Sequence, residues 1–238
     1  MTESTGDKIR YCYEFQVQGV RRRFELQLDR QTLALEHEPI PQYPDWTALS
    51  SQQCPNCPLT PEEHPRCPIA ANITGLVEFF ADIVSYDEVE VRISTDERSY
   101  SKRTITSEAV SSLLGIYMVT SGCPIMDKLR PLVRFHLPVA TVEETRFRAI
   151  AMYLVAQFFV HRKGGVPDWD LEKLPAIYRE IGMVNRSFME RLRQTVAQDA
   201  NLNAVVRLDC FASTIILTID TDELDEMEAT FLPYLTPE

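Results

Sequence analysis

Apolar and polar residues alternate along the first part of the chain. Apolar side chains occupy every second position over residues 9–17, and the alternation resumes over residues 24–28 and 33–35. A period of two with aromatic and aliphatic residues is typical of strands, and Gly19 between the first two runs favours a hairpin turn. The pattern predicts a three-stranded antiparallel β-meander over residues 1–38.

The apolar spacing changes after residue 68. Residues 69–86 carry apolar side chains three and four positions apart, which predicts a helix, and residues 88–106 alternate again about a central turn, which predicts a hairpin. The pattern is then mostly helical, although the segment 203–219 is compatible with helix or strand. We expect an α+β fold, in which the N-terminal antiparallel β-meander packs against a larger, mostly helical part over residues 69–238, as one compact domain overall.

Polar residues mark the expected ends of two helices. Thr141 is followed three positions later by Glu144, a capping box that predicts a helix over 142–161, and Gly164 marks its end. Asp170 is expected to cap the next helical segment.

The segment 39–68 between these parts is rich in proline. It holds eight of the fifteen prolines in the chain, which excludes a helix or a central strand. A loop of this length is either a linker or a functional element ordered by contacts other than regular secondary structure. Three cysteines within it favour a functional element.

Composition and charge narrow the function classes. With 24 basic and 35 acidic residues the chain carries a formal charge of −11, so nucleic acid is an unfavourable partner. The longest apolar run, 150–160, is too short to cross a membrane, and the first ten residues lack the apolar core of a secretory signal. We therefore expect a soluble cytoplasmic protein with no membrane partner; a protein partner stays open. The sequence motifs of common hydrolases and nucleotide-binding enzymes are absent.

Four of the six cysteines are followed directly by proline: Cys54, Cys57, Cys67 and Cys123. Proline is favoured at the first position of a helix, so Cys67 and Cys123 are expected at helix starts, where backbone N–H groups and the helix dipole lower a cysteine pKa. Cys54 and Cys57 are spaced to chelate one ion. The remaining two, Cys12 and Cys210, lie in regular apolar patterns and are expected to be buried.

Four thiolates from these positions predict one metal centre. A cysteine-only site selects zinc or an iron–sulfur cluster. His64 is the substitute for Cys123 in a Cys₃His zinc site. A [4Fe–4S] cluster is slightly favoured, because proline often follows a cluster ligand and Pro58 removes an N–H that a zinc knuckle would direct at sulfur. The expected role is structural or redox-sensing.

Two alternatives do not involve a metal. In the first, the chain is a thiol-dependent enzyme with Cys123 as nucleophile, His136 as its base and Arg134 as an anion clamp, since a cysteine at a helix start near cations is typical of a reactive thiol. In the second, the chain is a metal-free interaction protein whose cysteines are only buried.

The motifs also carry a resemblance. They are Cys-Pro-Asn-Cys-Pro-Leu at 54–59, Cys-Pro-Ile-Ala at 67–70, Ser-Gly-Cys-Pro at 121–124 and Arg-Phe-His-Leu-Pro at 134–138. Together they resemble a bacterial family of uncharacterised proteins over most of the chain. The resemblance implies no activity, substrate or cofactor, so the candidate site rests on the residues themselves.

Overall fold

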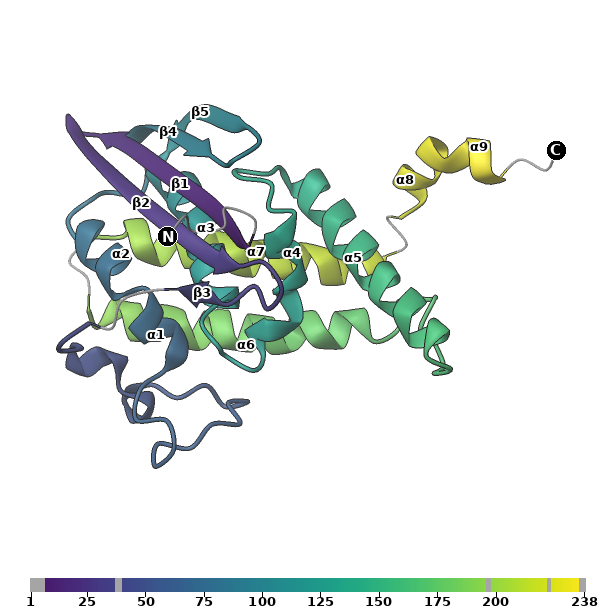
Figure 1. Ribbon diagram of the computed structural model, residues 1–238, viewed down its shortest axis with the longest axis horizontal. Coiled ribbons are helices and arrows are strands. Elements are labelled where there is room, and N and C mark those ends of the chain that lie inside the picture. The colour runs from purple at the N-terminus through teal and green to yellow at the C-terminus, as the bar shows by residue number, and fades with distance from the viewer. Residues whose placement is uncertain (1–6, 37–39, 196–197, 222–223, 236–238) are drawn as a thin grey trace.

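The computed structural model describes residues 7–36, 40–195, 198–221 and 224–235. Its five-stranded antiparallel sheet lies across a mostly helical part (Figure 1), so the α+β fold predicted from the sequence is confirmed. The strands, in the spatial order β3-β2-β1-β4-β5, are β1 (Lys8–Val17), β2 (Val20–Asp29), β3 (Leu35–Glu36), β4 (Glu88–Ser94) and β5 (Ser99–Ile105).

The first hairpin forms where the alternation predicts it. Val17 pairs with Val20, and the two turn residues between them, Gln18 and Gly19, have φ angles of +49° and +77°. Two successive positive φ angles match the right-handed twist of the strands. The third predicted strand is present but has only two residues, which pair with the end of β2.

The second hairpin extends the same sheet. β4 pairs with the other edge of β1, so that Phe15 lies opposite Val91. The inward side chains of β1 and β4 are buried almost completely, whereas β5 is half-buried at most. The sheet thus has one apolar face, and the segments 8–36 and 88–105 form a single layer.

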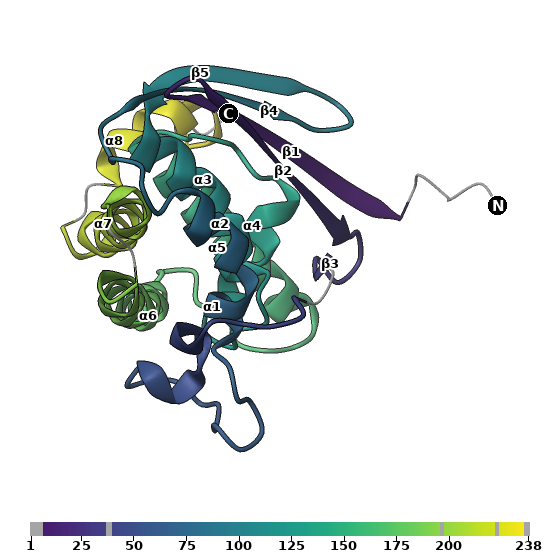
Figure 2. The same ribbon diagram turned by 90° about the vertical axis from the view of Figure 1, so that its left-hand side faces the viewer.

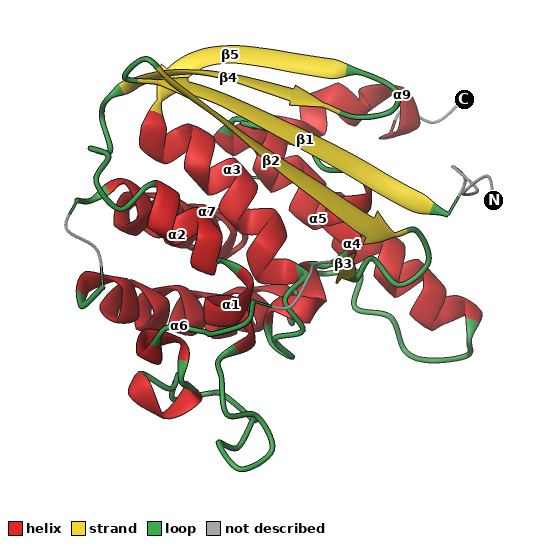
Figure 3. Ribbon diagram, turned by 60° about the vertical axis from the view of Figure 1, so that its left-hand side comes forward, coloured by secondary structure: helices red, strands yellow, loops and turns green. Residues whose placement is uncertain are grey.

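Helices cover that face in successive layers. Figures 2 and 3 show α3 directly beneath the sheet, with α7 and α6 beyond it. The longer helices are α3 (Thr106–Val119), α5 (Val142–Arg162), α6 (Leu174–Arg193) and α7 (Ala200–Asp220). The short ones are α1 (Pro68–Asn72), α2 (Thr74–Phe79), α4 (Pro131–Arg134), α8 (Asp225–Glu228) and α9 (Leu232–Leu235), with 3₁₀ turns η1 (Asp45–Thr47), η2 (Leu49–Ser51), η3 (Met126–Leu129) and η4 (Ala229–Phe231).

Two expected elements differ from the structure. The helix expected over 69–86 is divided at Ile73, whose φ and ψ of −105° and 7° are not helical, and it ends at Phe79.

The capping box at Thr141 is present and opens α5. Asp170, however, does not cap the next helix: Asp168 accepts the backbone N–H groups of Glu172 and Lys173 just before α6 begins.

The segment 203–219 is helical and lies within α7. Among the described residues, α7 is the one helix that is long and apolar enough to cross a membrane by length and composition. It packs against α6 and α3. Its apolar residues therefore contribute to the packing between helices.

Candidate functional site

The proline-rich loop is held to α6 by one buried arginine. Arg191 is 2% exposed, and its guanidinium donates hydrogen bonds to the main-chain oxygens of Ala48 (2.7 Å) and Gln52 (2.6 Å), and also to that of Trp46. A buried charge is tolerated when its hydrogen-bonding groups are satisfied. Arg191 therefore orders a segment that has little regular structure of its own.

Further hydrogen bonds close the loop on itself and on α6. The backbone N–H of Cys67 donates to the oxygen of Thr47 at 2.8 Å, which joins the two ends of the loop. The side-chain amide of Asn56 donates to the main-chain oxygen of Glu180 (3.0 Å) and to its carboxylate (2.6 Å). These contacts bring the Cys54–Cys57 turn, closed by an N–H···O bond of 3.0 Å between these two residues, against α6.

All four Cys-Pro cysteines line one small cavity. Cys54 and Cys57 come from the loop, Cys67 precedes the first residue of α1, and Cys123 begins the turn that leads into η3. Cys67 and Cys123 are buried, and the other two are partly exposed. The remaining wall is apolar except for Gln52 and Arg191; it consists of Leu49, Leu59, Pro68, Ile69, Ile125 and Val184.

Burial raises the pKa of two thiols in this cavity, those of Cys54 and Cys123. It raises the pKa of Cys54 to about 11, with a smaller contribution from the nearby Cys67 sulfur. The pKa of Cys123 is also raised, because burial outweighs the backbone N–H groups of Met126 and Ile125. The lowered pKa expected for Cys123 at a helix start is therefore wrong. The turn supplies the expected N–H groups, but the surrounding wall removes water from the thiol.

The sulfurs line the cavity without converging on one point. Within the described ranges, no three His, Cys, Asp or Glu side chains are placed closely enough to hold a metal ion. The cavity volume is about 20 Å³. Metal binding requires the cysteines to lose their protons, so deprotonation of the thiols and binding of a metal would be coupled here.

The other predicted residues lie elsewhere. His64 is exposed and does not line the cavity. Cys12 is half-exposed beside Arg23, whose Nε donates to its sulfur at 3.0 Å, and Cys210 is exposed. The expected burial of both is wrong. In β1 the residues on either side of Cys12 point inward, so Cys12 itself points outward.

The three residues of the alternative thiol enzyme line three different cavities. Cys123 lies in the four-cysteine cavity, His136 lines a cavity beside α3, and Arg134 lies at the surface, where it donates to the main-chain oxygen of Arg30 at 2.7 Å. His136 Nε2 lies 2.6 Å from the Tyr13 hydroxyl, and burial, helped by Arg148, lowers the pKa of His136 to about 3. The structure does not bring this set together.

Sequence reasoning missed Arg191, although a signal was present. Ile181, Val184 and Phe188 precede it at helical spacing on the buried face of α6. A charged residue in phase with such a stripe is expected to be paired, because an unpaired charge would be costly to bury.

Comparisons with known proteins assign the chain to a family but give no activity. No curated protein and no solved structure matches it significantly. A family model described as "Domain of unknown function (DUF6901)" matches residues 9–232. The chain therefore belongs to this family.

Proposed function

We propose that the chain binds one metal centre through Cys54, Cys57, Cys67 and Cys123. The observation that carries the proposal is that these four cysteines, from three separate segments, line one cavity. Cys12 and Cys210, which no proline follows, lie outside it. Four soft thiolate donors select zinc or an iron–sulfur cluster over hard cations.

Within this proposal a [4Fe–4S] cluster is favoured over zinc, because proline directly follows each of the four cysteines. In such a cluster each cysteine binds a different iron, so the four sulfurs stay further apart than around a single zinc ion. His64 lies outside the cavity, which removes the donor needed for a Cys₃His zinc site.

The cavity, of about 20 Å³, must open to accept a cluster, and we expect the Cys54–Cys57 turn of the loop to move. Cys67 and Cys123 lie at the starts of a helix and a helical turn, whereas Cys54 and Cys57 lie on a partly exposed turn held to α6 by Asn56. Outward movement of this turn enlarges the site while the other two ligands stay in place.

Arg191 supplies the charge that such a centre needs. Burial lowers the pKa of its guanidinium, and the sulfurs of Cys67, Cys54 and Cys57 act in the opposite direction. A cluster with four thiolates carries net negative charge, which an adjacent guanidinium stabilises. With four protein ligands and no open position, the centre has a structural or redox-sensing role. A cytoplasmic location belongs to the same proposal, because unpaired cysteines persist in reducing compartments.

The test is metal and sulfide analysis of protein purified without oxygen. We expect about four irons and four sulfides per chain, with a visible absorption band. Single Cys→Ser variants at positions 54, 57, 67 and 123 should lose most of the bound iron, whereas Cys12→Ser and Cys210→Ser serve as matched controls that keep it. If the wild type instead contains one zinc per chain, and the same four variants lose it, the proposed centre is a zinc site and not a cluster. Wild-type protein without metal would overturn the proposal.

A further inference from the structure

A large cavity in the described part of the chain is an apolar groove that none of the four Cys-Pro cysteines lines. It runs between α4, α5 and α6, has a volume of about 560 Å³, and its wall includes Phe135, Phe147, Met152, Phe159 and Ile177. Phe135 is 77% exposed and both Phe147 and Phe159 are 50% exposed. Ligand sites are typically mostly apolar cavities of this size with a few placed polar groups.

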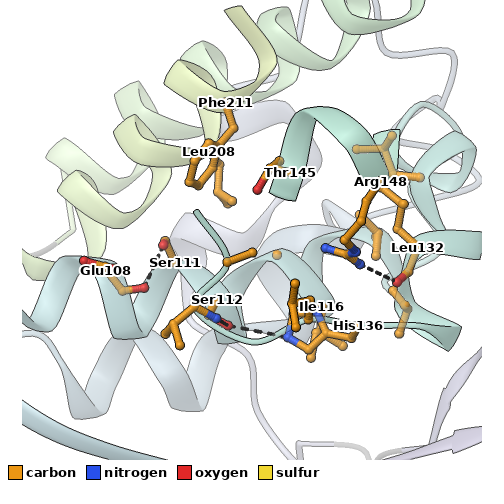
Figure 4. Close-up of a pocket in the computed structure, with 17 residues that line it drawn as sticks. Glu108, Ser111, Ser112, Ile116, Leu132, His136, Thr145, Arg148, Leu208 and Phe211 are labelled. Atoms are coloured by element: carbon orange, nitrogen blue, oxygen red, sulfur yellow. Dashed lines mark hydrogen bonds between the residues drawn. The ribbon is translucent and has the colours of Figure 1, made fainter. Parts of the chain in front are cut away.

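A second, smaller cavity adjoins the groove. It has a volume of about 160 Å³ and lies between α3, α5 and α7 (Figure 4). Leu129, Leu132 and Arg148 line both cavities. The Arg148 side chain therefore forms part of the wall of both spaces.

The charge of Arg148 is not matched by the protein around it. Its Nη2 donates to the main-chain oxygens of Leu132 and Phe135, each at 3.0 Å. In the described ranges no carboxylate lies within ion-pair distance of this guanidinium and no acceptor lies on Nη1. Figure 4 shows the side chain reaching from α5 into the smaller cavity. A half-buried cation among apolar side chains favours an anion as its partner.

The other polar groups of the smaller cavity already have partners. Ser112 Oγ accepts the N–H of Val139 at 3.0 Å, and both Ser112 Oγ and His136 Nε2 lie within hydrogen-bond distance of the Tyr13 hydroxyl. Glu108, at the far side, binds Lys102. An incoming anion would thus be drawn to Arg148 and away from Glu108.

We propose that this groove binds a single-chain amphipathic carboxylate of the fatty-acid type. Its carboxylate lies on Arg148 and its hydrocarbon chain lies along the apolar groove beside α5. Nη2 already donates both of its hydrogens to main-chain oxygens, so Nη1 is the group that would donate a charge-assisted hydrogen bond to the carboxylate. Lys128 also lines the groove and adds positive charge near it. The proposal is independent of the cysteine site.

The experiment is calorimetric titration of the full chain with decanoate below its micelle concentration, compared with 1-decanol. We expect one decanoate per chain and weaker binding of the uncharged alcohol. Arg148→Met should weaken decanoate binding about 10- to 100-fold, which is the usual range for loss of a charge-assisted hydrogen bond, and should leave 1-decanol binding unchanged. Arg148→Lys should retain part of the decanoate affinity. Arg103→Met removes an exposed arginine on β5 and is the matched control.

A variant in the groove tests where the hydrocarbon chain of the ligand lies. Ala156 lies on α5, is exposed and lines the groove, so Ala156→Trp fills the space without entering the core. It should weaken decanoate and 1-decanol alike. The proposal is overturned if folded wild-type protein shows no saturable decanoate binding. It is also overturned if Arg148→Met binds decanoate as tightly as the wild type does and the wild type binds 1-decanol as tightly as decanoate. A dimer that Ala156→Trp dissociates, without decanoate binding, would also overturn it and identify the groove as an interface between copies.

Discussion

The guanidinium of Arg191 lies 2.6 Å from the main-chain oxygen of Gln52, two residues before Cys54 in the chain. The contact joins the buried face of α6 to a loop that has little regular secondary structure. It also brings a positive charge to the wall of the four-cysteine cavity. Order in the loop and the charge of the cavity thus depend on the same side chain.

Arg191→Met should destabilise the protein strongly. The substitution keeps the apolar stem but leaves several buried carbonyl groups without a donor, which we expect to lower the free energy of unfolding by about 2–4 kcal/mol. Urea denaturation followed by circular dichroism measures the change. Arg193→Met, on the same helix at an exposed position, is the control and should change stability by less than about 0.5 kcal/mol. Equal effects at both positions would contradict the role of Arg191.

Asp168→Asn should destabilise the start of α6. The Asp168 carboxylate accepts the Tyr153 hydroxyl at 2.6 Å and two backbone N–H groups, and the hydrogen bond from Tyr153 is the main reason that its pKa is lowered. We expect a loss of about 1–2 kcal/mol at neutral pH, measured by urea denaturation. Asp170→Asn is the matched control at an exposed neighbouring position. A larger effect at Asp170 would mean that it, rather than Asp168, caps the helix.

Stability should fall with pH below about 6.5 because of His136. Its native pKa is about 3, below its ordinary value of 6.5, so the unfolded chain binds a proton in this window that the native state does not. Unfolding therefore becomes easier as pH falls from 6.5 toward 3, by up to about 1.4 kcal/mol per pH unit from this group. His136→Gln keeps hydrogen-bonding groups but does not titrate there. Its stability should fall less steeply between pH 6.5 and 4, whereas the exposed His161→Gln should keep the wild-type slope.

Thiol alkylation of metal-free protein should follow exposure. Cys210 is exposed and should react first, whereas Cys123 is buried with a raised pKa and should react slowly until the chain is unfolded. The thiolate is the reactive species, so both burial and protonation slow the reaction. Timed alkylation with mass spectrometry assigns each site. Rapid, selective modification of Cys123 in folded protein would instead support the nucleophile hypothesis.

Much of the fold follows from local patterns. Alternation in residues 9–17 places Tyr11, Tyr13 and Phe15 on one face, and those side chains are buried in the structure. The same alternation places Cys12 on the opposite face of the strand. The period of two therefore predicts an outward-pointing Cys12, as the structure has it. Helix ends were predicted less well: Asp168, rather than Asp170, binds the N–H groups that precede α6, because the turn between them determines which carboxylate reaches the backbone.

The sequence by itself determined the α+β class, the two hairpins and the distinction between cysteines with and without a following proline, because each is a short-range pattern. Only the tertiary structure decided that four cysteines line one cavity, that His136 and Arg134 lie away from Cys123, and that Arg148 lines two cavities. These relationships join segments far apart in the chain. Their distances depend on how the helices pack beneath the sheet, and the pKa values of the buried groups depend on the water which that packing excludes.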